Sequence, residues 1–168
     1  MSRPKKVTSS KTKSVAMITG APKKSVAEPE ALYSVSLYKA LDIPSGGELL
    51  FQALHKGFRF SVYNKLAAAS GLEKKQVAQY ALLPTATLSR RAKSGHFNTD
   101  ESDRLFRLTQ VMDAAIGLFE GDRHAAMQWL EKPAPGLGNR TPAQMMGTSV
   151  ESRAVLDLIS QLEHGVIA

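Results

Sequence analysis

The chain has 168 residues, 43% of them hydrophobic, a net charge of +7 and no cysteine. This length allows one or two small domains with a buried core, and the absence of cysteine excludes a disulfide framework, a thiolate nucleophile and a cysteine-based zinc site. No apolar run approaches the roughly 18–20 residues that cross a membrane, and the N-terminus lacks the apolar centre of a secretory signal, so the sequence predicts a soluble cytoplasmic protein.

The charge alternates along the chain. Residues 1–27 contain seven basic side chains and no acidic one, and residues 56–93 contain eight basic side chains against Glu73 alone. The stretches 28–55 and 94–168 are net acidic. Because basic clusters attract nucleic acid, the two basic stretches are the expected points of contact with it.

Residues 1–44 are predicted to form a flexible basic N-terminal arm and linker. Residues 1–27 have no aromatic side chain and cannot bury enough apolar surface to offset the entropy of ordering. A transit peptide is the competing interpretation, but lysine far outnumbers arginine here. Residues 28–44 remain open between a strand and a short helix docked on the core, with Tyr33, Val35, Leu37 and Leu41 as the apolar positions.

Two helices are predicted to follow. Ser45 and Glu48 have capping-box spacing, which favours a helix that starts there and stops near Gly57. A second helix, at about 61–70, should end at Gly71, a residue suited to a helix C-cap. The expected apolar positions are Leu49, Leu50, Ala53 and Leu54 in the first helix and Val62, Leu66 and Ala69 in the second.

The stretch from Leu83 to Lys93 carries the clearest functional signal. Placing Leu88 on the inner face of a helix puts Ala92 beside it and leaves a short, polar, cationic outer face. Residues 73–81 form a compact helix just before it, in which Val77, Tyr80 and Ala81 can face inward. Two short helices joined this tightly are typical of a helix-turn-helix.

The outer face of this second helix suits DNA, because arginine can bond guanine with two donors and serine or threonine can bond bases or phosphate. The alternative is an ordinary helical hairpin whose cationic face is merely solvated. The expected DNA contacts are Lys74, Lys75, Thr85, Thr87, Ser89, Arg90, Arg91 and Lys93.

The C-terminal half is predicted to be helical throughout. After Gly95, Asn98 and Glu101 mark a capped helix start, and the helix runs to about Glu120. Its apolar stripe is interpreted as core and consists of Leu105, Leu108, Val111, Met112, Ala115, Ile116 and Phe119.

Beyond Gly121, a helix is expected from Asp122 or Arg123 to Leu130, followed by a loop over 133–140. Thr141 and Pro142 are interpreted as the cap and first residue of a further helix. Thr148 and Glu151 cap the last helix, which ends at Gly165 and carries Val155, Leu158, Ile159 and Leu162 on one stripe. The predicted fold class is therefore all-α.

No catalytic, cofactor or metal site is predicted, and the chain is not expected to be an enzyme. The sequence contains no nucleophile elbow and no phosphate loop, and the acids Asp100 and Glu101 are explained by the helix start. Gly136-Leu137-Gly138 lacks the third glycine of a dinucleotide site. The histidines occur singly, without metal-ligand spacing, at His55, His96, His124 and His164.

A family resemblance accumulates along the chain. Its parts are Leu88-Ser89-Arg90-Arg91, Glu101-Ser102-Asp103-Arg104-Leu105, Trp129-Leu130 with Pro133, Leu137-Gly138 and Thr141-Pro142, and the ending His164-Gly165-Val166. Over roughly residues 47–168, this pattern resembles the Xre/MbcA/ParS antitoxins of bacterial type II toxin–antitoxin systems.

The resemblance implies an Xre-like helix-turn-helix domain at 45–112 and a small helical toxin-binding domain at 113–168. The first would bind the operon's own promoter, double-stranded DNA, as a homodimer, because operators tend to be symmetric. The second would bind a cognate toxin, usually a RES-domain protein that consumes NAD, so the NAD chemistry would belong to the partner. The alternative is a stand-alone transcription regulator with no toxin.

Inhibition would be steric, with the C-terminal end lying over the entrance to the toxin's active site. For Leu158 and Leu162, packing within the chain's own core is an equal alternative, and Arg140 and Arg153 could face water. The residues that the resemblance assigns to the toxin are Arg140, Arg153, Leu158, Leu162, His164, Gly165, Val166, Ile167 and Ala168.

Four positions depart from the family pattern. Leu82 stands where a helix-turn-helix often has glycine, which predicts an irregular turn, and Ala86-Thr87 replaces an Arg-Thr pair that would supply a base contact. Ala134 replaces an asparagine. Asn139 replaces a glycine, a mild change because asparagine tolerates left-handed backbone.

Overall fold

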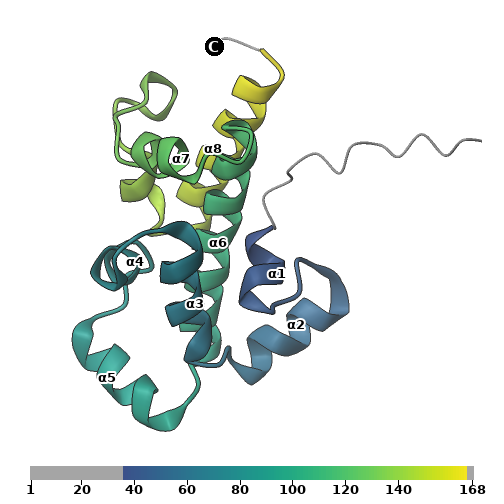
Figure 1. The fold of residues 1–168 in the computed structure, drawn as a ribbon, viewed down its shortest axis with the longest axis vertical. Coiled ribbons are helices and arrows are strands. Elements are labelled where there is room, and N and C mark those ends of the chain that lie inside the picture. The colour runs from purple at the N-terminus through teal and green to yellow at the C-terminus, as the bar shows by residue number, and fades with distance from the viewer. Residues whose placement is uncertain (1–35, 166–168) are drawn as a thin grey trace, which may run out of the picture. The chain divides into compact units, whose positions relative to one another are not determined.

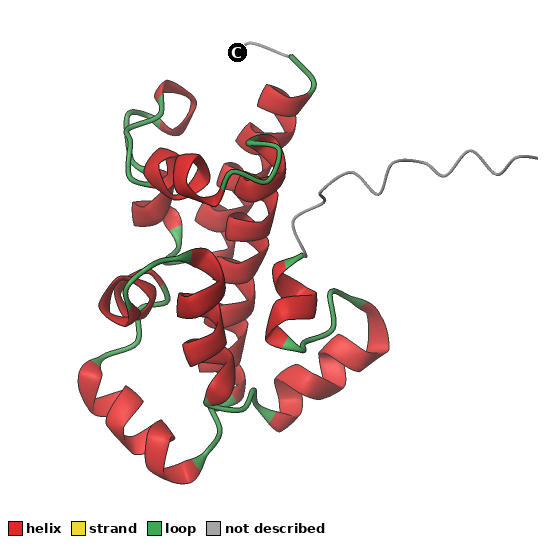
Figure 2. Cartoon of the chain, viewed as in Figure 1, coloured by secondary structure: helices red, strands yellow, loops and turns green. Residues whose placement is uncertain are grey.

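The structure is a computed structural model that describes residues 36–165. Within this range the chain is helical, with two isolated β-bridges and no named strand (Figure 2), which confirms the all-α prediction. None of the described helices is long and apolar enough to cross a membrane. The elements are α1 (Leu37–Leu41), α2 (Gly47–Lys56), α3 (Ser61–Ser70), α4 (Lys74–Tyr80), α5 (Thr85–Ser94), α6 (Thr99–Leu118), α7 (Arg123–Leu130), η1 (Pro135–Leu137), η2 (Pro142–Met145) and α8 (Ser149–Glu163).

Helix α6 is the central element of the described fold. It packs against α1, α2 and α3 along one part of its length and against α7 and α8 along another (Figure 1). The predicted apolar stripe is buried from Leu105 to Ile116, and Phe119 at the end is half-buried. A single helix therefore supplies the core on which both halves of the molecule are built.

Helix α1 resolves the ambiguity that the sequence left over residues 28–44. Leu37 and Leu41 are each 1% exposed and lie in the core, whereas Tyr33 and Val35 lie outside the described residues. The N-terminus of α1 is capped from α6, because Asp113 accepts hydrogen bonds from the Leu37 N–H at 2.6 Å and the Ser36 hydroxyl at 3.2 Å. Packed structure therefore begins before residue 45.

Burial of the Tyr38 ring, together with the charge of Asp113, raises the pKa of this tyrosine to about 12. Its ring lies against Phe106 of α6, with centroids 5.9 Å apart. Tyr38 therefore stays neutral at physiological pH and adds an aromatic contact to the attachment of α1.

Helix α2 corrects one prediction. Ser45 does not cap it; the N-cap is Gly46, with no side-chain hydrogen bond, because α2 begins one residue later than the capping-box spacing required. Leu50 is the only buried residue of the helix, while Leu49 and Phe51 are 69% and 56% exposed. The helix ends before Gly57, where any Cβ would overlap the Phe97 carbonyl, so this close approach of two loops requires glycine.

The remaining helices largely follow the predicted boundaries. Helix α3 ends at Gly71, whose φ of 77° is left-handed as expected of a C-cap, although Ala67 is buried more fully than the predicted Ala69. Asp122 caps α7 through the Ala125 N–H. Thr148 and Glu151 form the predicted capping box of α8. The helix expected at Thr141 is capped as predicted but is the short 3-10 segment η2.

Candidate functional site

Helices α4 and α5 form a tightly joined pair. Helix α4 begins with a capping box between Glu73 and Gln76 and buries Val77 completely. Four residues, 81–84, separate the two helices, and Ala81 and Leu83 in this turn are buried. Leu82 has a φ of 51°, a left-handed conformation that glycine adopts more readily. The irregular turn predicted from the absence of glycine is thus a leucine held in a glycine-like conformation.

Helix α5 buries none of its residues. Its half-buried side chains are Thr87, Leu88 and Arg91. Leu88 faces inward as predicted, but Ala92 is exposed, and its placement beside Leu88 on the inner face was wrong. The inner face is rotated toward Arg91, which is half-buried and donates a hydrogen bond to Glu101 of α6.

The outer surface of this pair is cationic. Arg90 has a side chain that is 65% exposed. The other exposed residues among the predicted DNA contacts are Lys74, Lys75, Thr85, Ser89 and Lys93, whereas Thr87 is half-buried. Six of the eight predicted residues are therefore exposed and accessible to a partner, whereas Thr87 and Arg91 are half-buried.

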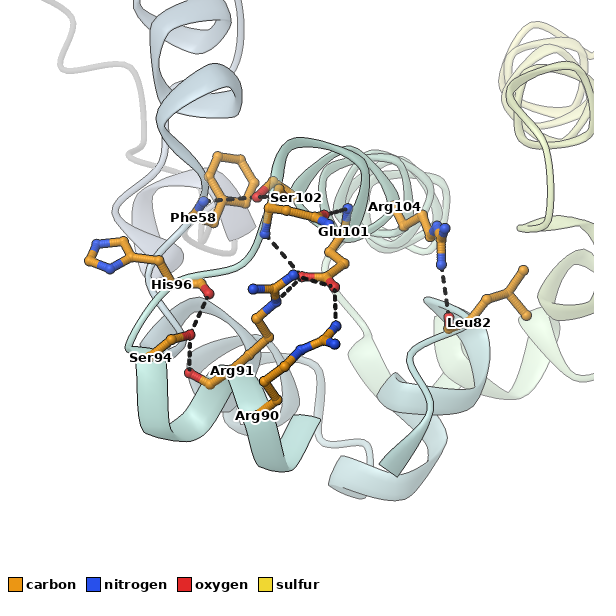
Figure 3. Close-up of polar contacts among 10 residues, drawn as sticks. Phe58, Leu82, Arg90, Arg91, Ser94, His96, Glu101, Ser102 and Arg104 are labelled. Atoms are coloured by element: carbon orange, nitrogen blue, oxygen red, sulfur yellow. Dashed lines mark hydrogen bonds and ion pairs between the residues drawn. The ribbon is translucent and has the colours of Figure 1, made fainter. Parts of the chain in front are cut away.

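Arg91 is engaged within the chain (Figure 3). Its Nε and Nη2 donate to the two carboxylate oxygens of Glu101 at 2.6 and 3.0 Å, and its side chain is only 19% exposed. The Arg90 guanidinium approaches the same carboxylate at 3.8 Å. Glu101 itself is 5% exposed and also accepts a hydrogen bond from the Asn98 backbone N–H at 3.0 Å.

Glu101 remains ionised despite its burial. Burial raises the pKa of its carboxyl group, but the hydrogen bonds from Arg91 and the Asn98 backbone, with the charges of Arg91 and Arg90, more than offset this effect. The resulting pKa lies below the ordinary value of a glutamate. The same hydrogen bond raises the pKa of Arg91. Both groups are therefore charged at neutral pH.

The next residues of α6 hold two further segments of the helix-turn-helix half (Figure 3). The Ser102 hydroxyl accepts a hydrogen bond from the Phe58 N–H at 2.8 Å and donates to the Asn98 carbonyl at 2.7 Å. Arg104 donates to the Leu82 carbonyl at 3.1 Å. Glu101, Ser102 and Arg104 thus contact α5, the loop before α3 and the α4–α5 turn. Sequence reasoning missed these roles, although the Glu-Ser-Asp-Arg-Leu motif marked the segment.

The second group of predicted site residues lies on α8 and the loop before it. Val155 and Ile159 are buried, whereas Leu162 is 45% exposed. Leu158 is half-buried and lies against Gly136, where an added Cβ would come within 2.8 Å of its Cδ1. Leu158 therefore packs within the chain, while Leu162 presents apolar surface to solvent.

The predicted polar contacts of this region are exposed. Arg140 is 52% exposed and pairs with Glu151 at 3.1 Å, and Arg153 is 75% exposed and pairs with Asp157 at 2.9 Å. His164 and Gly165 are exposed at the end of α8, and residues 166–168 lie outside the described part of the chain. The sequence prediction missed Val150, whose 78% exposure places a second apolar side chain on the outer surface of α8.

The segment between α7 and α8 is a scaffold for this region. Leu137 and Pro142 are buried, and the half-buried Trp129 lies against Phe119 with ring centroids 6.4 Å apart. Asn139 has a φ of 59°, the left-handed conformation that its replacement of glycine predicted. Among the described residues, no group of three or more histidine, aspartate or glutamate side chains is arranged to hold a metal ion.

A helix-turn-helix with an exposed cationic face is typical of a DNA-binding regulator, and here a second group of helices follows it. Two family profiles match the chain in this order. The antitoxin Xre-like helix-turn-helix domain covers residues 50–109, and the antitoxin Xre/MbcA/ParS C-terminal toxin-binding domain covers residues 114–165.

Named relatives match most of the chain. Antitoxin Xre of Yersinia enterocolitica is 34% identical over 135 residues, which cover 79% of this chain and 91% of the relative. Antitoxin Xre of Photorhabdus laumondii is 34% identical over 134 residues, covering 79% and 90%. A Sphingobium protein named Prs ADP-ribosylating antitoxin is 26% identical over 142 residues, covering 79% and 86%. The chain belongs to the Xre/MbcA/ParS family of antitoxins, as its motifs predicted.

This membership implies a binding partner for each half of the chain. The helix-turn-helix domain implies DNA binding, and the C-terminal domain implies a toxin partner. Both are binding domains of a regulatory protein.

Proposed function

We propose that this chain is the antitoxin of a type II toxin–antitoxin system whose toxin is a NAD-consuming RES-type protein. The observation that carries the proposal is that a helix-turn-helix domain and a toxin-binding domain both match on this one chain, at 50–109 and 114–165. The Sphingobium relative is named an ADP-ribosylating antitoxin, and ADP-ribosylation uses NAD, so this name links a related protein to NAD chemistry. Since NAD and the operon are both cytoplasmic, the chain is expected to act there.

The helix-turn-helix is proposed to bind the promoter of its own operon as a homodimer. The exposed side chains of Arg90 and Lys93 on α5 and of Lys74 and Lys75 on α4 are available for bases and phosphates. A single module of this size buries little surface on DNA, so two copies on a symmetric operator give specific affinity. Promoter binding would make the antitoxin regulate its own synthesis.

The C-terminal end is proposed to block the entrance to the toxin's active site. The support is the exposed apolar surface of Leu162 at the end of α8 and the exposed residues His164 and Gly165 that follow it. Val166, Ile167 and Ala168 continue this end beyond the described residues. Arg140 and Arg153 would flank the contact, whereas Leu158 is assigned mainly to packing against Gly136.

The toxin proposal is tested by inducing the neighbouring open reading frame with and without this chain, and by following growth and cellular NAD. We expect NAD to fall with the neighbour alone and to recover when the antitoxin is present. A chain that lacks residues 164–168 should still fold and should neutralise less well. Neutralisation equal to that of the full chain would refute the block by the C-terminal end but not the assignment as an antitoxin.

The competing function is a stand-alone helix-turn-helix regulator with no toxin. The exposed cationic face of α4 and α5 supports DNA binding under either function. A harmless neighbour and steady NAD, together with specific binding to a promoter, would favour this alternative.

The DNA contact is tested with Arg90→Ala. If Arg90 bonds a base, specific binding should weaken by about 1–3 kcal/mol, with relaxed preference at one operator position. Arg153→Ala is the matched control, since it removes another exposed arginine, from α8. An equal loss on operator and random DNA would make Arg90 a phosphate contact instead.

A further inference from the structure

The attachment of α5 differs from that of most other helices. None of its side chains is buried, and its N-cap residue, Pro84, offers no side-chain hydrogen bond. At its C-terminal end the Gly95 carbonyl accepts a hydrogen bond from the Phe60 N–H at 2.8 Å. Between these ends, α5 is held by the half-buried Leu88 and by Arg91. Apolar burial alone therefore leaves the orientation of this helix weakly specified.

Glu101 is a rigid anchor for Arg91. It occupies the N3 position of α6, where its carboxylate accepts the Asn98 N–H and its own N–H donates to the Asn98 side chain at 2.8 Å. These bonds hold the carboxylate in place independently of Arg91. A planar guanidinium bound through two donors has one preferred orientation. The Arg91–Glu101 pair therefore fixes the orientation of α5 relative to α6.

We propose that the Arg91–Glu101 pair positions α5, the second helix of the helix-turn-helix. Glu101 is then required for sequence-specific DNA binding although it does not contact DNA, and Arg91 acts through its pairing with Glu101. This inference rests on the proposed binding of promoter DNA. It separates the two adjacent arginines: Arg90, 65% exposed, reaches the DNA, whereas Arg91, 19% exposed, orients the helix that carries Arg90.

Simple electrostatics makes the opposite prediction for Glu101. Its negative charge lies within 3.8 Å of a DNA-facing arginine, so removal of the charge should strengthen binding to the phosphate backbone if charge were the only effect. A variant that makes the surface more positive and yet binds its operator less tightly would therefore reveal positioning. This difference in sign makes the proposal testable with one substitution.

The variant is Glu101→Gln. Glutamine at N3 supports a capping box, as Gln76 and Gln144 do in α4 and η2, so the start of α6 is retained while the charge that binds Arg91 is removed. Glu151→Gln is the matched control, because Glu151 is the N3 residue of the capping box of α8, in the toxin-binding domain.

The measurement is the affinity of each protein for the promoter fragment and for random DNA of equal length. For Glu101→Gln we expect promoter affinity to fall by about tenfold or more, with random-DNA affinity changed by less than about threefold. Glu151→Gln should bind both as the wild type does. Promoter affinity that is unchanged or higher in Glu101→Gln overturns the proposal. If the wild type shows no preference for the promoter, the proposed promoter binding fails instead, while the proposed neutralisation of a toxin is not affected.

A double-mutant cycle tests whether Arg91 acts through Glu101. We expect Arg91→Gln to weaken promoter binding, and we expect the double variant Arg91→Gln/Glu101→Gln to bind no more weakly than the weaker single variant. The dependence of affinity on salt should keep the wild-type slope in Arg91→Gln. Additive losses, or a slope reduced by about one, would show that Arg91 contacts phosphate directly and would overturn its positioning role. Because Arg91→Gln leaves the α6 capping box intact, the promoter affinity and salt slope of this single variant decide the question even if Glu101→Gln folds poorly.

Discussion

Helices α5 and α8, each proposed to contact a partner, are attached to the fold in different ways. Helix α8 buries Val155, Ile159 and Ser152 and begins with a complete capping box. Helix α5 buries no side chain and is held by an ion pair with Glu101. A buried apolar stripe fixes the position of a helix, but the buried face is then not available to a partner. A polar attachment leaves most of the helix surface exposed to a partner, and the position of the helix then depends on a few charged groups.

The largest effect should come from breaking the apolar attachment of α8. Val155→Asp puts a charge at a position that is 0% exposed, and we expect the free energy of unfolding to fall by more than about 3 kcal/mol. Val150→Asp is the matched control on the same helix, where the side chain is 78% exposed and a change within about 0.5 kcal/mol is expected. Urea unfolding measures both. Similar losses in the two variants would contradict the apolar attachment.

The polar attachment of α5 should contribute less to stability. Glu101→Gln removes a charge-assisted pair but keeps the capping box, so we expect a loss of about 1–2 kcal/mol in the free energy of unfolding. Glu151→Gln breaks the more exposed pair with Arg140 and should cost less than about 1 kcal/mol. A loss for Glu101→Gln as large as that for Val155→Asp would mean that the pair holds the whole fold and not α5 alone.

The contribution of Glu101 should also depend on pH with a defined sign. Because its pKa is lower in the folded state than the ordinary 4.5, the ionised carboxylate stabilises the fold above that value. The difference in stability between wild type and Glu101→Gln should therefore be full at neutral pH and should shrink as the pH falls below 4.5 and through the lowered pKa. Urea unfolding across this range measures it, and a difference that does not change with pH would contradict the ion pair.

The smallest effect concerns the turn between α4 and α5. Leu82 holds a left-handed backbone with φ of 51° and is 49% exposed, so Leu82→Gly should relieve strain with little loss of packing. We expect a gain of up to about 1 kcal/mol in the free energy of unfolding, reduced by the greater entropy of unfolded glycine. The reverse change at the C-cap of α5, Gly95→Ala at φ of 81°, should destabilise. Thermal melting of the two variants should shift in opposite directions.

The sequence predicted those features that depend on neighbouring residues. The capped start of α6, the capping box of α8, the glycine end of α3 and the apolar stripe of α6 all follow from local spacing. Ser45 is an instructive exception, since the spacing of a capping box was present but α2 begins at Gly47 without it. Local patterns therefore predict helix starts to within about one residue, but a shift of one residue is enough to remove a predicted cap.

The contacts that hold α5 and the loop before α3 against α6 could not be predicted from the spacing of residues along the sequence. Glu101 and Arg91 belong to different helices, and Ser102 reaches back to Phe58. The motif around Glu101 was recognised, but its acids were explained by helix capping alone. The same limit placed Ala92 on the inner face of α5, because an apolar residue was preferred there over an arginine with an acidic partner distant in sequence.

The most direct test of this contrast is amide hydrogen exchange in wild type and Glu101→Gln. If the ion pair holds α5 and the apolar stripe holds α8, exchange should accelerate across α5, from Thr85 to Ser94, and stay at the wild-type rate across α8, from Ser149 to Glu163. Unchanged exchange in α5, or equal acceleration in both helices, would contradict the account.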